Sequence, residues 1–412
     1  MYIYTQKGNN TKNNEIMKRV RNLTLCIGII TVFLCACSGG GQRTISGLNP
    51  ADFDTIINNK AVKLFTLTNE SGMEACITNY GGRLVSLCVP NKAGQLTDVV
   101  LGFDNIHQYA DTVNTPSDFG ASIGRYANRI NKGQLKVGGK TIQLPTNNFG
   151  HCLHGGPSGW QYQVYDAVQP NDSTLQLSIV SPDGDNNFPG TVTAKVIYTL
   201  TSDNVLDIKY EATTDRETVI NMTNHSYFNL TGDMSQAGTN MVLYINADNY
   251  TPIDSTFIPN GKVKSVYGTP LDFTKRHALY ETIGDTSFEQ IKYARGYDHN
   301  WCLNTYTKGK GNDKIVAASL YAPIQEFVLK CSLLSLAYKY IRAISLMVKS
   351  KESMALLIPS MRRYAWKARN TPIRRTILIS HLHISNLARH TLAIQHTDLE
   401  SNSVPTDIMR TI

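Results

Sequence analysis

Metal-binding cysteine spacing and long helical periodicity are both missing from this sequence of 412 residues. Apart from those in an N-terminal apolar run, the cysteines form no CxxC pair and no other metal-binding spacing, so metal dependence gets no support. We interpret the cysteines outside that run as structural thiols. No long amphipathic helix pattern occurs either, so nothing competes with the strand patterns described below. The thiols concerned are Cys76, Cys88, Cys152, Cys302 and Cys331.

Glycine is absent from the C-terminal part of the chain. Residues 324–412 contain none, whereas the preceding residues hold all 30. At an ordinary frequency of about 7%, roughly six would be expected there. The same stretch carries 13 Lys+Arg against 5 Asp+Glu; subtracting these from the totals of 40 and 32 leaves 27 of each sign before it. The basic excess therefore belongs to the tail, and it is no argument for nucleic-acid binding by the rest of the chain.

The N-terminal part has the pattern of an export signal. Residues 1–16 are polar and unpatterned, and we interpret them as an upstream extension before the true start. Residues 17–37 combine a basic start, a short apolar run and the sequence LCAC, which predicts a lipoprotein signal peptide with Cys37 as the acylated residue. A flexible linker over 38–50 follows. The protein is then exported and lipid-anchored to a bacterial membrane, with its domain in the periplasm or outside the cell. An uncleaved apolar anchor is the alternative.

Residues 51–322 have the length of one large domain, and they show strand patterns throughout. Val, Ile, Tyr and Thr alternate with polar residues over 174–180, 191–200 and 205–213. Clusters rich in Asn, Asp and Gly separate these runs. Many short strands with regular turns predict an all-β fold, a large antiparallel sandwich or barrel.

We interpret residues 221–230 (NMTNHSYFNL) as the stretch around which the chain is organised. They combine one imidazole, one phenol, one serine hydroxyl and three carboxamides with strand-forming aromatic residues. This mixture favours a strand that carries polar groups into a ligand cavity. An imidazole can give or take a proton near neutral pH, which makes His225 a candidate acid or base. A single histidine satisfied by its neighbours at a strand edge is the alternative.

Three more motifs contain groups suited to binding a polar ligand. Residues 124–130 (GRYANRI) place a carboxamide beside a guanidinium, and residues 151–156 (HCLHGG) place an imidazole before two glycines, where a backbone can approach a ligand closely. The two histidines of HCLHGG lie three apart, but no matching third metal ligand follows. Residues 296–301 (GYDHNW) add a carboxylate and an indole that could stack on a sugar ring.

Taken in order, these motifs resemble those of the aldose 1-epimerases (galactose mutarotases), together with SPDGDNNFPG and YTPIDSTFIPNG. The resemblance covers roughly residues 79–303. It implies a large antiparallel β-sandwich that binds an aldose and interconverts its α and β anomers without a cofactor or metal. It also implies that His225 is the general acid at the ring oxygen and that His154 orients the sugar. Positions matching the substrate-binding residues are Asn128, Arg129, Ser226, Tyr227 and Asp298.

The general base of the family is missing from the chain as written. The family carries it as a glutamate in a C-terminal CLETQ-like motif, and nothing after Pro323 reads that way. If the reading frame is moved by two bases, however, any codons for Trp366 and Lys367 give a glutamate. The neighbouring codons then allow the sequence CLES around it. In that frame, suitable codons also give YQGNFFDG and QKHPDSPNHPHFPSTHL, which resemble missing family segments. We therefore interpret residues 323–412 as an out-of-frame tail. A genuine basic extension that contacts anionic lipid or nucleic acid is the alternative.

Three classes of function follow. The first is a mutarotase acting on a small-molecule aldose, touching the membrane only through its lipid anchor and binding no nucleic acid. The second is a non-catalytic sugar-binding relic that has lost its base. The third is an inert or poorly folded product, because loss of the last strands would expose sheet edges.

Overall fold

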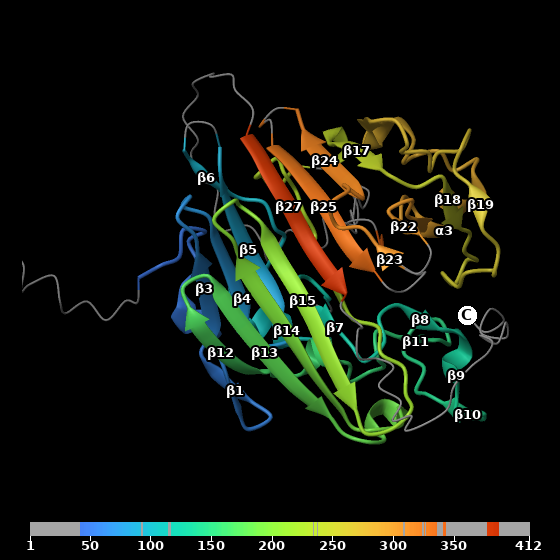
Figure 1. The fold of residues 1–412 in the computed structure, drawn as a ribbon, viewed down its shortest axis with the longest axis horizontal. Helices are drawn as coiled ribbons and strands as arrows, with labels where there is room; N and C mark the ends of the chain where they lie inside the picture. The colour runs from blue at the N-terminus through green and yellow to red at the C-terminus, as the bar shows by residue number, and fades with distance from the viewer. Residues whose placement is uncertain are drawn as a thin grey trace, which may run out of the picture. The chain divides into compact units, whose positions relative to one another are not determined.

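The computed structural model describes residues 42–91, 94–113, 117–233, 235–236, 238–307, 310–323, 325, 327–335, 341–342 and 377–386. The predicted upstream extension, the signal peptide with Cys37 and the residues Trp366 and Lys367 lie outside this set. Figure 1 shows that the regular elements of the described part are mostly strands, with very little helix. In that part, no helix is long and apolar enough to cross a membrane.

The largest element is a nine-stranded sheet, seen from one face in Figure 1. Its strand order is β12 (Asp166–Asn171), β13 (Thr174–Ser181), β14 (Val192–Leu200), β15 (Leu206–Thr214), β27 (Ile377–Asn386), β25 (Phe327–Ser335), β24 (Ala318–Ala322), β17 (Val242–Ile245) and β20 (His277–Ala278). The strands β13, β14 and β15 match the three predicted alternating runs to within one residue and pair antiparallel.

Alternation explains how this sheet forms a core. Every second residue of β14 is buried, from Val192 through Tyr198 to Leu200, because successive side chains of a strand point to opposite faces. A four-stranded antiparallel sheet packs into the same hydrophobic cluster, with Ile77 and Leu84 among its buried residues. The predicted all-β sandwich is therefore confirmed. This second sheet consists of β3 (Leu64–Thr68), β4 (Glu74–Thr78), β5 (Arg83–Pro90) and β6 (Leu96–Asp98).

The middle of the large sheet differs from a purely antiparallel arrangement. There β27, red in Figure 1, lies between β15 and β25 and runs parallel to both. Its residues belong to the segment predicted to be an out-of-frame tail. A strand in this place pairs the backbone groups of β15 and β25, which would otherwise be unpaired sheet edges.

The remaining elements are short. A second four-stranded sheet contains β19 (Lys264–Ser265), β18 (Asn249–Thr251), β21 (Asn300–Cys302) and β26 (Ile341–Arg342). The strand pairs are β1 (Thr55–Ile57) with β2 (Lys60–Val62), β7 (Ser122–Ile123) with β16 (Thr223–Asn224), β8 (Arg129–Ile130) with β11 (Cys152–Leu153), β9 (Gln134–Val137) with β10 (Lys140–Gln143), and β22 (Tyr306–Thr307) with β23 (Lys310–Gly311). The described helices are α2 (Ile106–Ala110), α3 (Glu289–Ala294) and the 3-10 turns η1 (Pro50–Phe53), η2 (Asn131–Gly133), η3 (Trp160–Tyr162), η4 (Asp185–Asn187), η5 (Gly238–Asn240) and η6 (Leu279–Glu281).

Part of the segment predicted to be a linker makes specific contacts with the sandwich. The backbone N–H groups of Ile45 and Ser46 donate to the Glu74 carboxylate on β4, and the hydroxyls of Ser46 and Ser86 hydrogen-bond at 3.0 Å. The described cysteines carry no disulfide, and four of the five are buried. Burial raises the pKa of Cys76 to about 12, which agrees with structural thiols.

Candidate functional site

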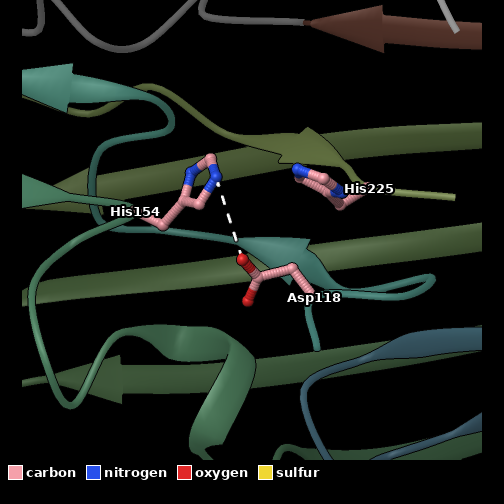
Figure 2. A group of neighbouring side chains, drawn as sticks. All are labelled: Asp118, His154 and His225. Atoms are coloured by element: carbon pink, nitrogen blue, oxygen red, sulfur yellow. Dashed lines mark ion pairs between the residues drawn. The ribbon is translucent and has the colours of Figure 1, made fainter. Parts of the chain in front are cut away.

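Two buried histidines face each other in the region of β7, β8, β11 and β16. The ring centroids of His154 and His225 lie 5.2 Å apart and the ring planes are nearly perpendicular. Both side chains are almost fully buried, with exposed fractions of 3% and 5% for the two residues. The structure thus brings together two histidines from motifs far apart in the sequence (Figure 2).

The position of His225 follows from the strand pair β7–β16. Thr223 and Asn224 pair with Ile123 and Ser122, so His225 is the first residue after the ladder. Its N–H donates to the carbonyl of Ala121 at 2.8 Å, and its own carbonyl accepts from the N–H of Gly120 at 3.0 Å. These bonds fix the backbone from which the imidazole projects.

The position of His154 depends on Asn128. The N–H of His154 donates to the Asn128 carbonyl, and the N–H of Asn128 donates to Nδ1 of the His154 ring, both at 3.0 Å. Both residues have left-handed backbones, with φ of 67° for Asn128 and 52° for His154. Non-glycine residues seldom adopt this conformation, and it recurs at functional sites. Gly155 is required beside them, because a Cβ there would lie 2.2 Å from the carbonyl oxygen of Gly124.

The bond from Asn128 also selects the tautomer of His154. A nitrogen that accepts an N–H bond carries no proton, so in the neutral ring the proton is on Nε2. Nε2 is therefore a hydrogen-bond donor.

A third residue, Asp118, completes this cluster, and no motif in the sequence pointed to it. Its Oδ2 lies 3.9 Å from Nε2 of His154. A dashed line in Figure 2 marks this ion pair. Arg83, which is fully buried on β5, donates from Nη1 to the carbonyl oxygens of Ser117 and Phe119. This guanidinium therefore holds the backbone on both sides of Asp118. A buried arginine that precedes the aspartate by tens of residues gives no local sequence signal.

Geometry alone would allow a metal ion here. One ligand atom each from Asp118, His154 and His225 lies within 4.8 Å of the others, and this group contains only one of the two histidines of HCLHGG. Coordination needs a nitrogen lone pair, however, and Nε2 of His154 carries the proton while Nδ1 accepts from Asn128. The donor set therefore fits a hydroxyl-bearing ligand better than a cation.

A pocket adjoins the histidine pair through Asn128. Three of the predicted substrate-binding residues, Asn128, Arg129 and Asp298, line it together. The Arg129 guanidinium lies 4.7 Å from the centre of the Phe257 ring and donates from Nε and Nη2 to the carboxamide oxygen of Asn148. The remaining lining residues are Thr251, Ile253, Phe257, Pro259, His299 and Asn300.

Two residues that line this pocket hold buried polar atoms. Among the described residues, Oγ1 of Thr251 and Oδ1 of Asn300 are buried without a hydrogen-bond partner, and the two residues pair across β18 and β21. Burial lowers the pKa of His299 to about 4, so this imidazole is neutral at pH 7 and is no proton donor there. Trp301, interpreted from sequence as a sugar-stacking indole, is instead part of the core: it is 3% exposed and donates to the Leu271 carbonyl.

The two other predicted residues, Ser226 and Tyr227, are buried next to His225. The ring of Tyr227 packs between those of His225 and Phe119, at 5.2 and 5.1 Å. Within the described residues, Oγ of Ser226 has no hydrogen-bond partner. Neither residue lines the pocket of Asn128 and Asp298.

The carboxamides of the 221–230 motif have structural roles, which corrects the interpretation that they hold a ligand. Asn221 donates to the Ala127 carbonyl, Asn224 to the Gly120 carbonyl, and Asn229 to the carbonyls of Asp233 and Gln236. They tie the motif to neighbouring turns, which helps to keep His225 in place.

Arg125 and His151 also have structural roles, although both belong to motifs that contain site residues. Arg125 is 2% exposed and donates to four carbonyl oxygens in residues 181–190 and to the Ser181 hydroxyl, over 2.6–3.1 Å. It thereby joins the GRYANRI motif to the SPDGDNNFPG loop. His151 accepts from the Lys132 N–H and bonds Thr256 through Nε2, so it is not a second ligand beside His154.

Comparison with known proteins agrees with these features. The family model described as Aldose 1-epimerase matches residues 63–330. The aldose 1-epimerase of Escherichia coli is 38% identical over 269 residues, covering 65% of this chain and 75% of that protein. Human galactose mutarotase is 38% identical over 227 residues, covering 55% of this chain and 63% of that protein.

Solved structures give the same result for the fold. An aldose epimerase homologue from C. elegans superposes with a TM-score of 0.58 at 29% identity, covering 65% of this chain and 77% of its own. A galactose 1-epimerase from Lactobacillus acidophilus gives 0.56 at 30% identity, with 65% and 75% covered. The match of the family model over residues 63–330, which include both site histidines, is decisive: this chain belongs to the aldose 1-epimerase family.

Proposed function

We propose that this protein is an aldose 1-epimerase, which interconverts the α and β anomers of aldohexoses such as galactose and glucose. The observation that supports this most is the pair of buried imidazoles of His154 and His225, 5.2 Å apart, inside the region matched by the family model. Proton transfer by positioned groups typically contributes about 10²–10⁴-fold to such a reaction.

In the proposed reaction, a base removes the proton of the anomeric hydroxyl and the O1–C1 double bond forms as the C1–O5 bond breaks. His225 gives its proton to O5. Rotation about C1–C2 then presents the other face of the aldehyde, and O5 attacks it while both protons return. His154 orients the sugar, and the substrate-binding residues are Asn128, Arg129, Ser226, Tyr227 and Asp298. The pocket shared by Asn128, Arg129 and Asp298 supports this assignment for those three.

We further propose that the general base is a glutamate encoded in another reading frame. One comparison supports this, because the family match ends at residue 330. The frame change lies near the codon of Pro323, and the base arises from the codons now read as Trp366 and Lys367. Sequencing of the gene across the codons of residues 321–325 tests this directly.

The site of action is also a proposal. The basic start, apolar run and LCAC sequence of residues 17–37 support acylation at Cys37 and a lipid anchor in a bacterial membrane, with the domain outside the cytoplasm.

The activity is tested by the optical rotation of freshly dissolved α-galactose and α-glucose, measured beside equilibrium sugar binding by the same protein. A frame-restored chain should accelerate the change in optical rotation. In that chain, His225→Asn should lower kcat by at least about 10²-fold while changing sugar affinity little. The exposed His107 on α2 provides a matched control, and His107→Asn should leave the rate unchanged. Sugar binding without any acceleration by the restored chain would instead indicate a non-catalytic sugar-binding protein.

A further inference from the structure

Asp118 and His154 present complementary groups at an unusual separation. Oδ2 of Asp118 and Nε2 of His154 lie 3.9 Å apart, beyond the usual length of a direct hydrogen bond. One oxygen atom can lie about 2.8 Å from both atoms at this separation. The two side chains therefore suit a single bridging oxygen.

The chemistry of the two atoms restricts what that oxygen belongs to. The bond from the Asn128 N–H to Nδ1 makes Nε2 of His154 a donor, and an ionised carboxylate only accepts. The bridging group must accept from the imidazole and donate to the carboxylate, as a hydroxyl group does. A metal cation is disfavoured by the proton on Nε2, and an anion is disfavoured by the charge of Asp118.

The surroundings of Asp118 are built to hold it at this point. Arg83 bonds the carbonyl oxygens of Ser117 and Phe119, at 3.2 and 3.0 Å, and the adjacent Gly120 N–H bonds the carbonyl of His225. The Asp118 side chain is 23% exposed, compared with 4% for His154. The open side of the pair is therefore at the carboxylate, and a hydroxyl group bound there would also reach Nε2 of His154.

We propose that Asp118 is a substrate-binding residue, which accepts a hydrogen bond from one hydroxyl group of the aldose while Nε2 of His154 donates to the same oxygen. This inference rests on the proposed function, because it takes the aldose as the ligand. It extends the site by a residue that the family motifs in this sequence did not point to. It also gives His154 a defined task, since the locked tautomer offers its N–H to that one hydroxyl.

The test is a set of binding titrations with the full 412-residue chain, in which NMR detects ligand binding. The ligands are galactose, glucose and galactose analogues that each lack one hydroxyl. Asp118→Asn, nearly isosteric, should weaken galactose binding at least about tenfold, because the charged acceptor of the hydrogen bond is replaced by a neutral amide. One analogue, which lacks the bridging hydroxyl, should bind the unaltered chain and the variant equally. Asp166→Asn is the matched control, since Asp166 is an exposed residue that pairs with Lys60, and it should change no affinity.

Several outcomes would overturn the inference. The affinity of Asp118→Asn for galactose could be unchanged, or it could fall equally for every analogue. Either result would assign Asp118 a structural role, and lower melting temperatures of Asp118→Asn and Asp118→Ser would then show it. Unchanged affinity, together with turnover lower by about 10²-fold when Asp118→Asn is placed in the frame-restored chain, would make Asp118 a base instead. If no aldose binds either the unaltered chain or the frame-restored chain, the inference fails together with the proposed function. If the Asp118 dependence is found but a frame-restored chain does not exchange anomers, only the proposed function fails.

Discussion

The backbone N–H of Asn128 donates a 3.0 Å hydrogen bond to Nδ1 of His154. This one contact joins the GRYANRI and HCLHGG motifs, and it decides which ring nitrogen faces Asp118. It also connects the histidine pair to the pocket that Asn128 lines with Arg129 and Asp298.

The first prediction concerns that tautomer. In protein labelled with ¹⁵N at histidine, the neutral His154 ring should show a protonated Nε2 and an unprotonated Nδ1. His151, whose Nδ1 accepts from the Lys132 N–H, should show the same pattern and serves as an internal reference. A proton on Nδ1 of His154 would contradict both the metal argument and the proposed role of Asp118.

Arg125 should be important for stability rather than for sugar binding. Arg125→Lys keeps the charge, but the lysine ammonium lacks the planar guanidinium that donates to several carbonyl oxygens of residues 181–190 at once. Some of these buried oxygens therefore lose their hydrogen-bond donor. We expect the free energy of unfolding to fall by about 3 kcal/mol, measured by urea denaturation. Arg216→Lys is the control, because Arg216 is 57% exposed and its ion pairs should contribute little. Equal effects of the two substitutions would refute this assignment.

Asp98 should make stability depend on pH. Burial, opposed by hydrogen bonds from the N–H groups of Leu87 and Val100, raises the pKa of this carboxyl to about 6. Because the folded pKa lies above the unfolded value, the folded state binds the proton more tightly, and this group's stabilising contribution falls as pH rises from about 4 through 6. Asp98→Asn keeps an acceptor for both N–H groups without the charge.

The variant should therefore be more stable than the unaltered chain at pH 7.5, by about 1–3 kcal/mol, and the difference should vanish near pH 4. Thermal unfolding at both pH values measures this, with Asp166→Asn as the control. A difference that stays the same at both pH values would show that the charge of Asp98 is not its cause.

The membrane anchor is tested in cells that carry the chain with Cys37→Ala. Labelling with a radioactive fatty acid should be lost, and the protein should leave the membrane fraction. Cys76→Ala, at a buried thiol of the sandwich, should leave labelling intact. Unchanged labelling in Cys37→Ala would contradict lipidation at this residue.

The fold could be predicted from the sequence where one face of a strand is buried. The runs that became β13, β14 and β15 alternate strictly, and their boundaries were predicted to within one residue. Their period-2 pattern is local information. The parallel position of β27 could not be predicted in this way, because it depends on which sheet edges other segments leave open.

The site was less accessible to sequence reasoning. His154 and His225 were found through motif resemblance, and they do lie together. Asp118 was missed because its contact with His154 depends on a distant arginine, Arg83, that holds its backbone. Trp301 was misinterpreted because an indole suits a sugar face and a hydrophobic core equally well, and only tertiary packing separates the two.

The central claim is that this chain derives from an acid–base mutarotase whose base is encoded out of frame. It is tested most directly by one measurement, the rate at which fresh α-galactose loses its optical rotation with three proteins. These are the chain as written, the frame-restored chain, and the restored chain with the new glutamate changed to glutamine. We expect the restored chain to be active without metal or nucleotide, and the other two to be slower by at least about 10²-fold. Equal rates for the chain as written and the restored chain would contradict the claim, because the base would then lie within the residues already present.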